Sequence, residues 1–73
     1  MHAARLAHSA RLQRVAALLA DGRRYSTLEI VLLAAVCAVN SCIAELRANG
    51  VPIRCWREGD VWYYQQEQHE PER

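Results

Sequence analysis

The segment from Ser26 to Gly50 limits what this chain can fold into more than any other feature. It begins with Ser-Thr-Leu-Glu, a capping box in which the Ser26 hydroxyl accepts from the Glu29 N–H and the Glu29 carboxylate accepts from the Ser26 N–H. It ends at Asn-Gly, because glycine takes the left-handed conformation after a helix without steric cost. A helix over residues 27–49 would be long for 73 residues, since globular helices usually run about 8–20 residues. We therefore predict two helices separated by a tight turn at residues 34–35.

Apolar residues at helical spacing predict the helices on either side. The first covers residues 9–20, because its apolar side chains follow the i, i+3, i+4, i+7 spacing of one helix face. These side chains are Leu12, Val15, Ala16 and Leu19. The third helix covers residues 37–49 and has an apolar face of the same kind. That face consists of Val39, Ile43 and Leu46.

The middle helix is predicted to expose part of its apolar surface. We expect Leu28, Val31 and Ala35 to face the core. Ile30 and Leu33 then point roughly the opposite way. An exposed apolar patch usually marks a surface that contacts another protein.

The C-terminal part of the chain has the composition of a β-hairpin. Residues 53–57 and 61–64 are rich in strand formers, and the Glu-Gly-Asp between them is typical of a turn. With a two-residue loop, the residues that face the helices are Ile53, Cys55, Trp62 and Tyr64. With a three-residue loop, Val61 and Tyr63 point inward instead. The pattern leaves both registers open.

Together these elements predict an α+β fold that is mostly α. Helix, extended link, helix, tight turn, helix and hairpin is the layout of a three-helix winged helix-turn-helix with a C-terminal two-stranded β-hairpin wing. The predicted domain covers residues 9–64. Residues 1–8 are expected to be a flexible N-terminus or an extension of the first helix. Residues 65–73 contain no apolar side chain, so we expect a polar, disordered tail.

The charge distribution indicates basic patches within a nearly neutral protein. The net charge is +1, yet residues 1–27 carry five arginines against one acid, and residues 51–73 carry more acids than arginines. A nucleic-acid-binding protein usually shows a clear basic footprint. Three cysteines, an odd number, without a preceding signal peptide favour free thiols in the cytoplasm of a bacterial cell.

Several function classes are excluded at this level. The apolar run over residues 30–39 has ten residues, whereas a membrane span needs about 20, so no membrane partner is expected. The spacing of Cys37 and Cys42 fits no metal site on a helix. The chain has no nucleophile with a neighbouring base, no glycine-rich phosphate loop and no carboxylate pair on a rigid element. We therefore expect neither enzyme activity nor a cofactor, metal or small-molecule substrate.

The sequence also resembles a known family over residues 12–64. The stretches Tyr-Ser-Thr-Leu-Glu, Ile-Ala-Glu-Leu-Arg-Ala-Asn-Gly-Val-Pro-Ile and Val-Trp-Tyr-Tyr are similar to those of small helix-turn-helix domains in bacteriophage and prophage proteins. The signature that closes the third helix in that family corresponds here to Ile43, Leu46, Arg47, Gly50 and Ile53. The resemblance implies a DNA-binding role in a phage or mobile element. The sequence departs from the family in its apolar second helix and in a third helix that lacks basic residues on its outer face.

Candidate DNA contacts fall at three places in this layout. Helix N-termini attract phosphate, the start of a recognition helix contacts bases, and the wing reaches the backbone. The predicted contacts are Arg23, Arg24, Ser26, Thr27, Asn40, Ser41, Arg54 and Arg57. We expect Arg47 to pack along its helix or to meet the wing.

A second set of residues is predicted to contact a protein partner or a second copy of the chain. Aromatic and aliphatic anchors are favoured at such interfaces. The predicted anchors are Ile30, Leu33, Trp56 and Tyr63. Two functions therefore remain open: a small DNA-binding regulator or accessory factor that dimerises through the second helix, and a winged helix without DNA readout that acts as an inhibitor or adaptor of a host protein, such as an anti-defence protein.

Overall fold

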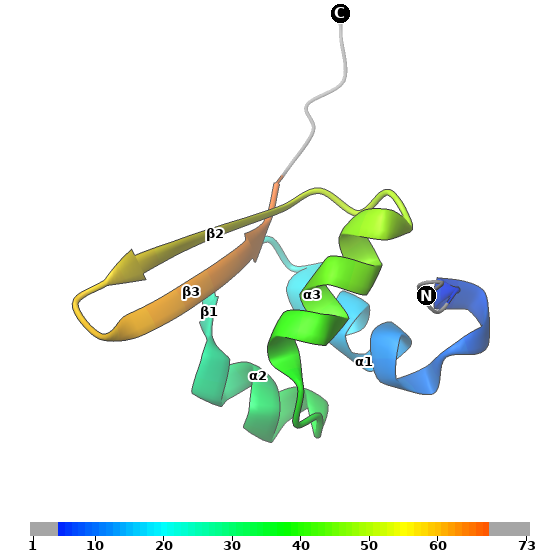
Figure 1. Ribbon diagram of the computed structural model, residues 1–73, viewed down its shortest axis with the longest axis horizontal. Coiled ribbons are helices and arrows are strands. Elements are labelled where there is room, and N and C mark those ends of the chain that lie inside the picture. The colour runs from blue at the N-terminus through cyan, green and yellow to red at the C-terminus, as the bar shows by residue number, and fades with distance from the viewer. Residues whose placement is uncertain (1–4, 68–73) are drawn as a thin grey trace, which may run out of the picture.

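The computed structural model describes residues 5–67 as an α+β fold with three α-helices and a three-stranded antiparallel sheet (Figure 1). The elements, in chain order, are η1 (Leu6–His8), α1 (Ala10–Leu19), β1 (Tyr25–Ser26), α2 (Thr27–Ala34), α3 (Val39–Ala48), β2 (Ile53–Glu58) and β3 (Val61–Gln66). The β2–β3 hairpin extends well past the three helices (Figure 1). The predictions for residues 1–4 and 68–73 lie outside the described residues.

Helix α1 lies where its apolar spacing predicts it. Its N-cap is Ser9, whose Oγ accepts from the backbone N–H of Leu12 at 3.2 Å. The stripe that faces the core is fully buried and consists of Leu12, Val15 and Leu19. The short helix η1 precedes it and is tied to the end of α3, because the N–H of Leu6 donates to Oδ1 of Asn49 at 3.0 Å.

The predicted break in the central segment is present at Ala35. The capping box starts α2, with Ser26 N–H donating to Glu29 Oε1 at 2.8 Å and Glu29 N–H donating to Ser26 Oγ at 3.1 Å. Ala35 ends α2 in the left-handed conformation, at φ 55°. Arg14 of α1 donates to the carbonyl oxygens of Ala34 and Ala35 at 2.8 and 3.3 Å. It thereby satisfies carbonyl groups that the end of a helix leaves unpaired.

The break turns the chain sharply between the two helices. Helices α2 and α3 are bent by 84° relative to each other. No single helix in residues 5–67 is long and apolar enough to cross a membrane, and only α2 and α3 taken together, as a bent pair, meet that test of length and composition. The bend turns one side of α3 toward the core and leaves the other side exposed.

The hairpin closes with the shorter of the two predicted loops. Glu58 pairs with Val61, so the loop contains only Gly59 and Asp60. On the face toward the helices, the residues near the base of the hairpin, Ile53 and Tyr64, are buried. Cys55 and Trp62 share that face but are exposed. Cys55 lies on the edge strand β2, and Trp62 lies nearer the loop, where the hairpin extends past the helices (Figure 1).

The predicted two-stranded hairpin is present, but the sheet contains a third strand that was not predicted. Tyr25, which the sequence places in an extended link, pairs with Tyr64 and makes β1 the third strand. A strand of two residues is too short to show an alternating pattern. The sheet also continues past the predicted end of the domain, since β3 runs to Gln66 and the Gln65 amide donates to the carbonyl oxygen of Gly22 at 2.7 Å.

The core lies between the three helices and the base of the sheet. It contains Leu12, Val15, Leu19, Ile30, Ala34, Val36, Val39, Cys42, Ile43, Leu46, Ile53 and Tyr64. The predicted orientation of α2 was wrong: Ile30 is 0% exposed, whereas Leu28 is 65% exposed. Because α2 is apolar on almost every side, its spacing does not single out one face. Packing against α1 and the sheet selects Ile30 and Ala34.

We expect substitutions on the buried and exposed sides of α2 to change the free energy of unfolding by different amounts. Ile30→Ala should lower the free energy of unfolding by about 2–5 kcal/mol, because it opens a cavity in the core. Leu33→Ala, at a side chain that is 63% exposed, should change it by no more than about 0.5 kcal/mol. Urea denaturation followed by circular dichroism measures both, and Ile30→Val is the milder variant if Ile30→Ala does not fold. Equal effects of the two alanine variants would contradict the assigned orientation of α2.

Candidate nucleic-acid interface

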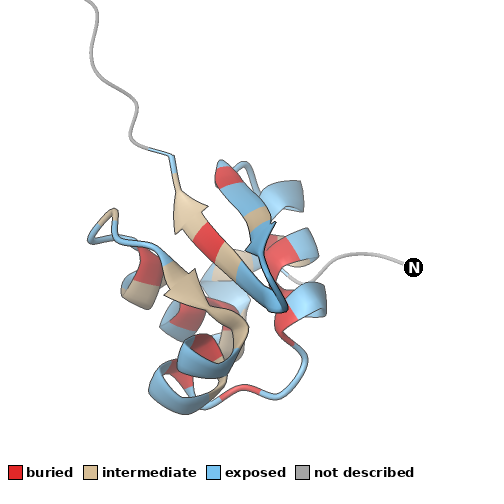
Figure 2. Cartoon of the chain, turned by 90° about the vertical axis from the view of Figure 1, so that its left-hand side faces the viewer, coloured by how far each residue is buried: buried red, intermediate tan, exposed pale blue. Residues whose placement is uncertain are grey.

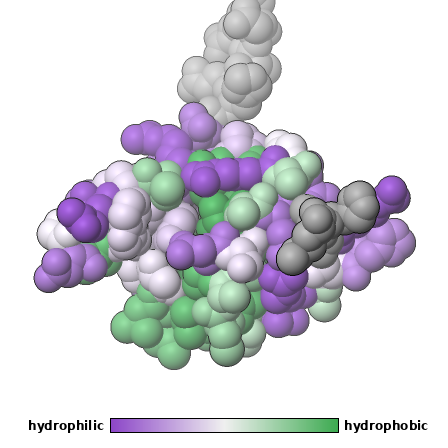
Figure 3. Space-filling model, in the orientation of Figure 1, coloured by the Kyte–Doolittle hydropathy of each residue, from purple (hydrophilic) through white to green (hydrophobic). Residues whose placement is uncertain are grey.

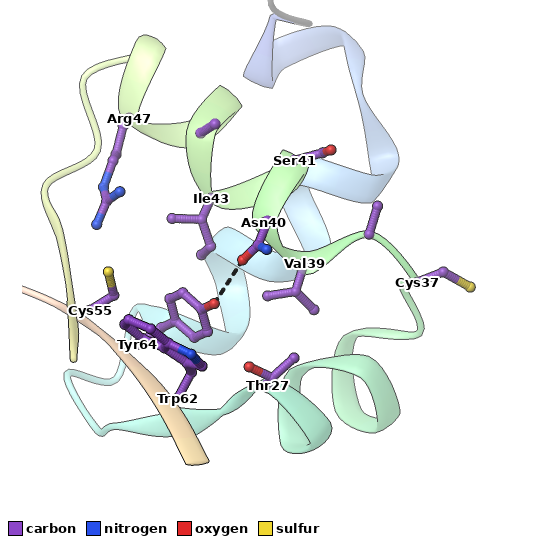
Figure 4. A pocket seen from close by; sticks show the side chains of 12 residues that line it. Thr27, Cys37, Val39, Asn40, Ser41, Ile43, Arg47, Cys55, Trp62 and Tyr64 are labelled. Atoms are coloured by element: carbon purple, nitrogen blue, oxygen red, sulfur yellow. Dashed lines mark hydrogen bonds between the residues drawn. The ribbon is translucent and has the colours of Figure 1, made fainter. Parts of the chain in front are cut away.

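An open groove of about 790 Å³ lies between α3, the start of α2 and the inner face of the hairpin (Figure 4). Three of the predicted DNA contacts line it, namely Thr27, Asn40 and Ser41. The hairpin contributes Cys55, Trp62 and Tyr64, and α3 also contributes Ala44 and Arg47. The groove therefore joins the exposed side of a helix to the exposed part of a sheet.

The exposed side of α3 presents small and polar side chains to this groove. Asn40 Oδ1 accepts from the Tyr64 hydroxyl at 2.9 Å (Figure 4). This bond holds the amide in place and leaves its NH₂ group to donate outward. Ser41 is exposed beside it, and Ala44 lies one turn further along the same side. Small side chains allow the helix backbone to approach a ligand closely.

The distal part of the hairpin presents one arginine on the groove side. Arg57 pairs with Trp62 across the strands, and its guanidinium lies 6.0 Å from the centre of the Trp62 ring. Trp62 is 45% exposed. A guanidinium stacked on an aromatic ring keeps its N–H donors at the edge, where they can reach a phosphate or a carboxylate.

Arg54, by contrast, lies on the outer face of the hairpin, because successive strand residues point to opposite faces. Its guanidinium lies 5.4 Å from the centre of the Trp56 ring, and Trp56 stacks on Tyr63 with ring centres 5.9 Å apart. The Arg24 guanidinium lies 4.5 Å from the centre of the Tyr63 ring. The four side chains form one continuous cluster on the outer face of the hairpin. The two aromatic partner anchors predicted from sequence therefore pack against arginines of the same chain.

Arg24 is also held by an ion pair. Its Nη1 lies 3.1 Å from Oε2 of Glu58, which accepts in addition from the indole N–H of Trp56 at 2.7 Å. Arg23, the next predicted phosphate contact, is exposed, and its side chain makes no hydrogen bond or ion pair within residues 5–67. The adjacent Ser26 hydroxyl serves as the helix cap described above. Of these three residues, Arg23 is the one whose donors are open.

Three further arginines have structural partners within the described residues. Arg14 caps the end of α2, as described above. Arg11 forms an ion pair with Glu45 at 3.1 Å. The pKa of Arg11 is raised, mainly by its hydrogen bond to the Cys42 sulfur and next by its hydrogen bond to Glu45. Arg47 donates to the carbonyl oxygen of Ile53 at 2.8 and 3.2 Å, so it meets the hairpin as expected. The contacts of Arg11 and Arg14 join elements that are far apart in the sequence, whereas Arg47 joins α3 to the strand that follows it.

An apolar patch covers the exposed side of α2. It consists of Leu28, Leu32 and Leu33, which are 65%, 69% and 63% exposed. The patch dominates the hydrophobic region at the lower edge of Figure 3. Of the two α2 residues predicted as partner anchors, Leu33 belongs to this patch and Ile30 belongs to the core.

Two large side chains that line the groove, Trp62 and Arg47, were not among the predicted DNA contacts. Trp62 was expected to cover the helices, and it became a groove residue because the hairpin is longer than the helical layer. Arg47 was expected to be structural, and it both caps a strand carbonyl and lines the groove. Among residues 5–67, no group of three His, Cys, Asp or Glu side chains is placed to hold a metal ion.

Comparison with protein families, with curated proteins and with solved structures found no match to this chain.

We expect the link before β1 to show an acid-dependent contact. The Tyr25 hydroxyl bonds to the Asp21 carboxylate, and this bond, with the Arg23 N–H, lowers the pKa of Asp21; the same bond raises the pKa of Tyr25. The stabilisation from Asp21 is therefore present above its ordinary pKa of about 3.9 and is lost as pH falls through the depressed value. Carbon-detected NMR titration should show a lower Asp21 pKa than in an unfolded peptide, and Tyr25→Phe should raise it. An unchanged pKa in Tyr25→Phe would contradict the contact.

Proposed function

We propose that this chain is a small winged-helix protein that binds double-stranded DNA, as a transcriptional regulator or accessory factor of the phage or mobile-element type. The order α1, β1, α2, α3, β2, β3 and the strand order β1-β3-β2 agree with that layout. The 84° bend between α2 and α3 is close to the helix-turn-helix crossing of about 90–120°. In such a unit the second helix, here α3, enters the major groove.

The exposed side of α3 is the observation that carries the proposal. It combines an oriented amide, Asn40, with the hydroxyl of Ser41 and the small side chain of Ala44. An Asn amide pairs with adenine in the major groove, and Ser donates or accepts at either base type. No side chain caps the N-terminus of α3, so its first backbone N–H groups are open to a phosphate.

The arginines with open donors limit how strongly this interface binds. Arg57 lies beside the groove and Arg23 lies near the start of α2. The hairpin tip also carries Glu58 and Asp60, which repel phosphates. With two or three phosphate contacts, the logarithm of the binding constant should fall with the logarithm of salt concentration with a slope of only about −2 to −3. Binding to arbitrary DNA is therefore expected to be weak.

The residues behind the phage resemblance have structural roles here. Ile43, Leu46 and Ile53 are core residues, Arg47 caps the Ile53 carbonyl, and Gly50 has φ 90°. The signature thus accounts for the connection between α3 and β2. It supports the proposed fold type, whereas the DNA target depends on the side of α3 that the signature does not include.

A second function is favoured by the leucine patch on α2. Three neighbouring leucines that are each more than 60% exposed are unusual for a monomer and typical of a protein-binding surface. In this alternative the chain is an inhibitor or adaptor that docks on a host protein, for example as an anti-defence protein, without reading DNA. The neutral side of α3 agrees with it.

We expect DNA binding to depend on Arg57 and not on Arg54. Fluorescence anisotropy with a mixed-sequence duplex at about 50 mM salt should give a Kd of about 10⁻⁴–10⁻⁶ M. Arg57→Ala should weaken binding and reduce the salt slope by about 0.9, the value of one phosphate contact. Arg54→Ala removes the same charge from the opposite face of the hairpin and is the matched control. No binding to any duplex by the wild-type chain would refute the DNA-binding function.

If the alternative function is correct, a photo-crosslinker placed on α2 should capture the host protein. Benzoylphenylalanine in place of Leu32 should yield a discrete adduct in the producing cell if α2 docks on a protein. The same group in place of Gln13, exposed on α1, is the control and should yield none. Identical patterns from both positions, or no adduct from Leu32, would count against a partner on α2.

A further inference from the structure

The hairpin strand β2 is an open edge of the sheet. The strand order is β1-β3-β2, so β2 pairs with β3 on one side only. It is six residues long, and four of its residues are exposed. In Figure 2 it is the mostly exposed outer strand of the sheet. An unpaired strand edge is a template for pairing with another chain.

The structure shows which backbone groups of β2 are available. Glu67 N–H donates to the carbonyl oxygen of Pro52 at 2.9 Å, which makes the neighbouring Ile53–Gln66 pair a non-hydrogen-bonded one. The carbonyl of Ile53 accordingly points away from β3, where Arg47 caps it. Because the pattern alternates along the strand, Cys55 and Arg57 also direct their N–H and C=O groups to the open edge.

We propose that a second copy of this chain docks on this edge, with the two β2 strands antiparallel across a twofold axis at Trp56. Cys55 of each copy then lies opposite Arg57 of the other, and these pairs exchange four backbone hydrogen bonds. Arg54 of each copy lies opposite Glu58 of the other. The two three-stranded sheets become one sheet of six strands. This proposal does not depend on DNA binding.

Charge complementarity selects both the occupant and the register. In the proposed register Arg54 and Glu58 share the outer face with Trp56, so two opposite-charge pairs flank a Trp–Trp contact. Directly opposed side chains of this kind stabilise a strand pair. A shift of two residues toward the loop places Arg57 opposite Arg57. A shift of two residues the other way leaves no ion pair and requires the Ile53 carbonyl that Arg47 already caps.

The existing contacts of Glu58 are compatible with this pairing. Its carboxylate accepts from Arg24 and from the Trp56 indole. An ionised carboxylate has about four lone-pair sites, so one position stays open to Arg54 of the second copy. Arg24 and Trp56 hold the carboxylate on the outer face, where that arginine arrives.

Reversing the charge of Arg54 or of Glu58 tests the register of the two β2 strands, and the experiment needs no DNA. Arg54→Glu gives a β2 strand with two acids at these positions, and Glu58→Arg gives one with two arginines. Sedimentation equilibrium should show a weak wild-type dimer and a Kd at least about tenfold higher for each variant alone, because two attractive pairs become two repulsive ones. An equimolar mixture of the two variants should restore dimerisation, since each acid then faces an arginine. Circular dichroism confirms that each variant is folded.

A cysteine variant tests the position of the axis. In a background with Cys37→Ser and Cys55→Ser, Trp56→Cys should form an intermolecular disulfide on mild oxidation, because residues at the axis have Cβ atoms about 4.5–5.5 Å apart. Arg54→Cys in the same background is the control, since its two copies lie four residues apart along the paired strands. A wild-type chain that stays monomeric at about 1 mM, or a dimer that survives both charge variants and is lost in Leu32→Glu, would overturn the proposal.

Discussion

The left-handed turn at Ala35 is the constraint on which the rest of this structure depends. A residue with a β-carbon pays about 1–2 kcal/mol to adopt this conformation, and Ala35 adopts it at φ 55°. The turn is held because Arg14 binds the carbonyls of residues 34 and 35, and because Ala34 and Val36 on either side of it are buried. The 84° bend that follows separates α3 from α2. It gives α3 one side for the core and another for the groove beside the hairpin.

Arginine contacts explain why the basic N-terminal region offers so little free charge. Arg11 and Arg14 join α1 to α3 and to the end of α2, and Arg24 binds Glu58 of the hairpin. A guanidinium has five donors in one plane, so it can satisfy carbonyls and carboxylates of two elements at once. A charge count over the sequence treats these residues like the exposed Arg57. In the structure, the N–H donors of these arginines already bind groups of the same chain, whereas those of Arg57 face solvent beside the groove.

Much of the local structure could be predicted because it depends on neighbours in the chain. The Ser26 capping box, the stripe of α1 and the stop at Gly50 involve residues within one or two helical turns. The sequence allowed a hairpin loop of two or of three residues, and each loop length determines which side chains of the two strands face the helices. The candidate site followed less closely. Asn40 and Ser41 were predicted on the exposed side of α3 and line the groove, whereas Arg24, a predicted phosphate contact, is held by Glu58 and Tyr63.

The sequence by itself determined where helices begin and end, where the chain breaks and which segments form the hairpin, because capping, left-handed turns and strand alternation are short-range effects. Only the tertiary structure decided that Ile30 is buried while Leu28 is exposed, since an almost wholly apolar helix has no preferred face until other elements pack on it. It also decided the third strand, which consists of two residues and exists only because β3 lies beside it. Both outcomes depend on contacts between residues far apart in the chain, which spacing along the sequence does not record.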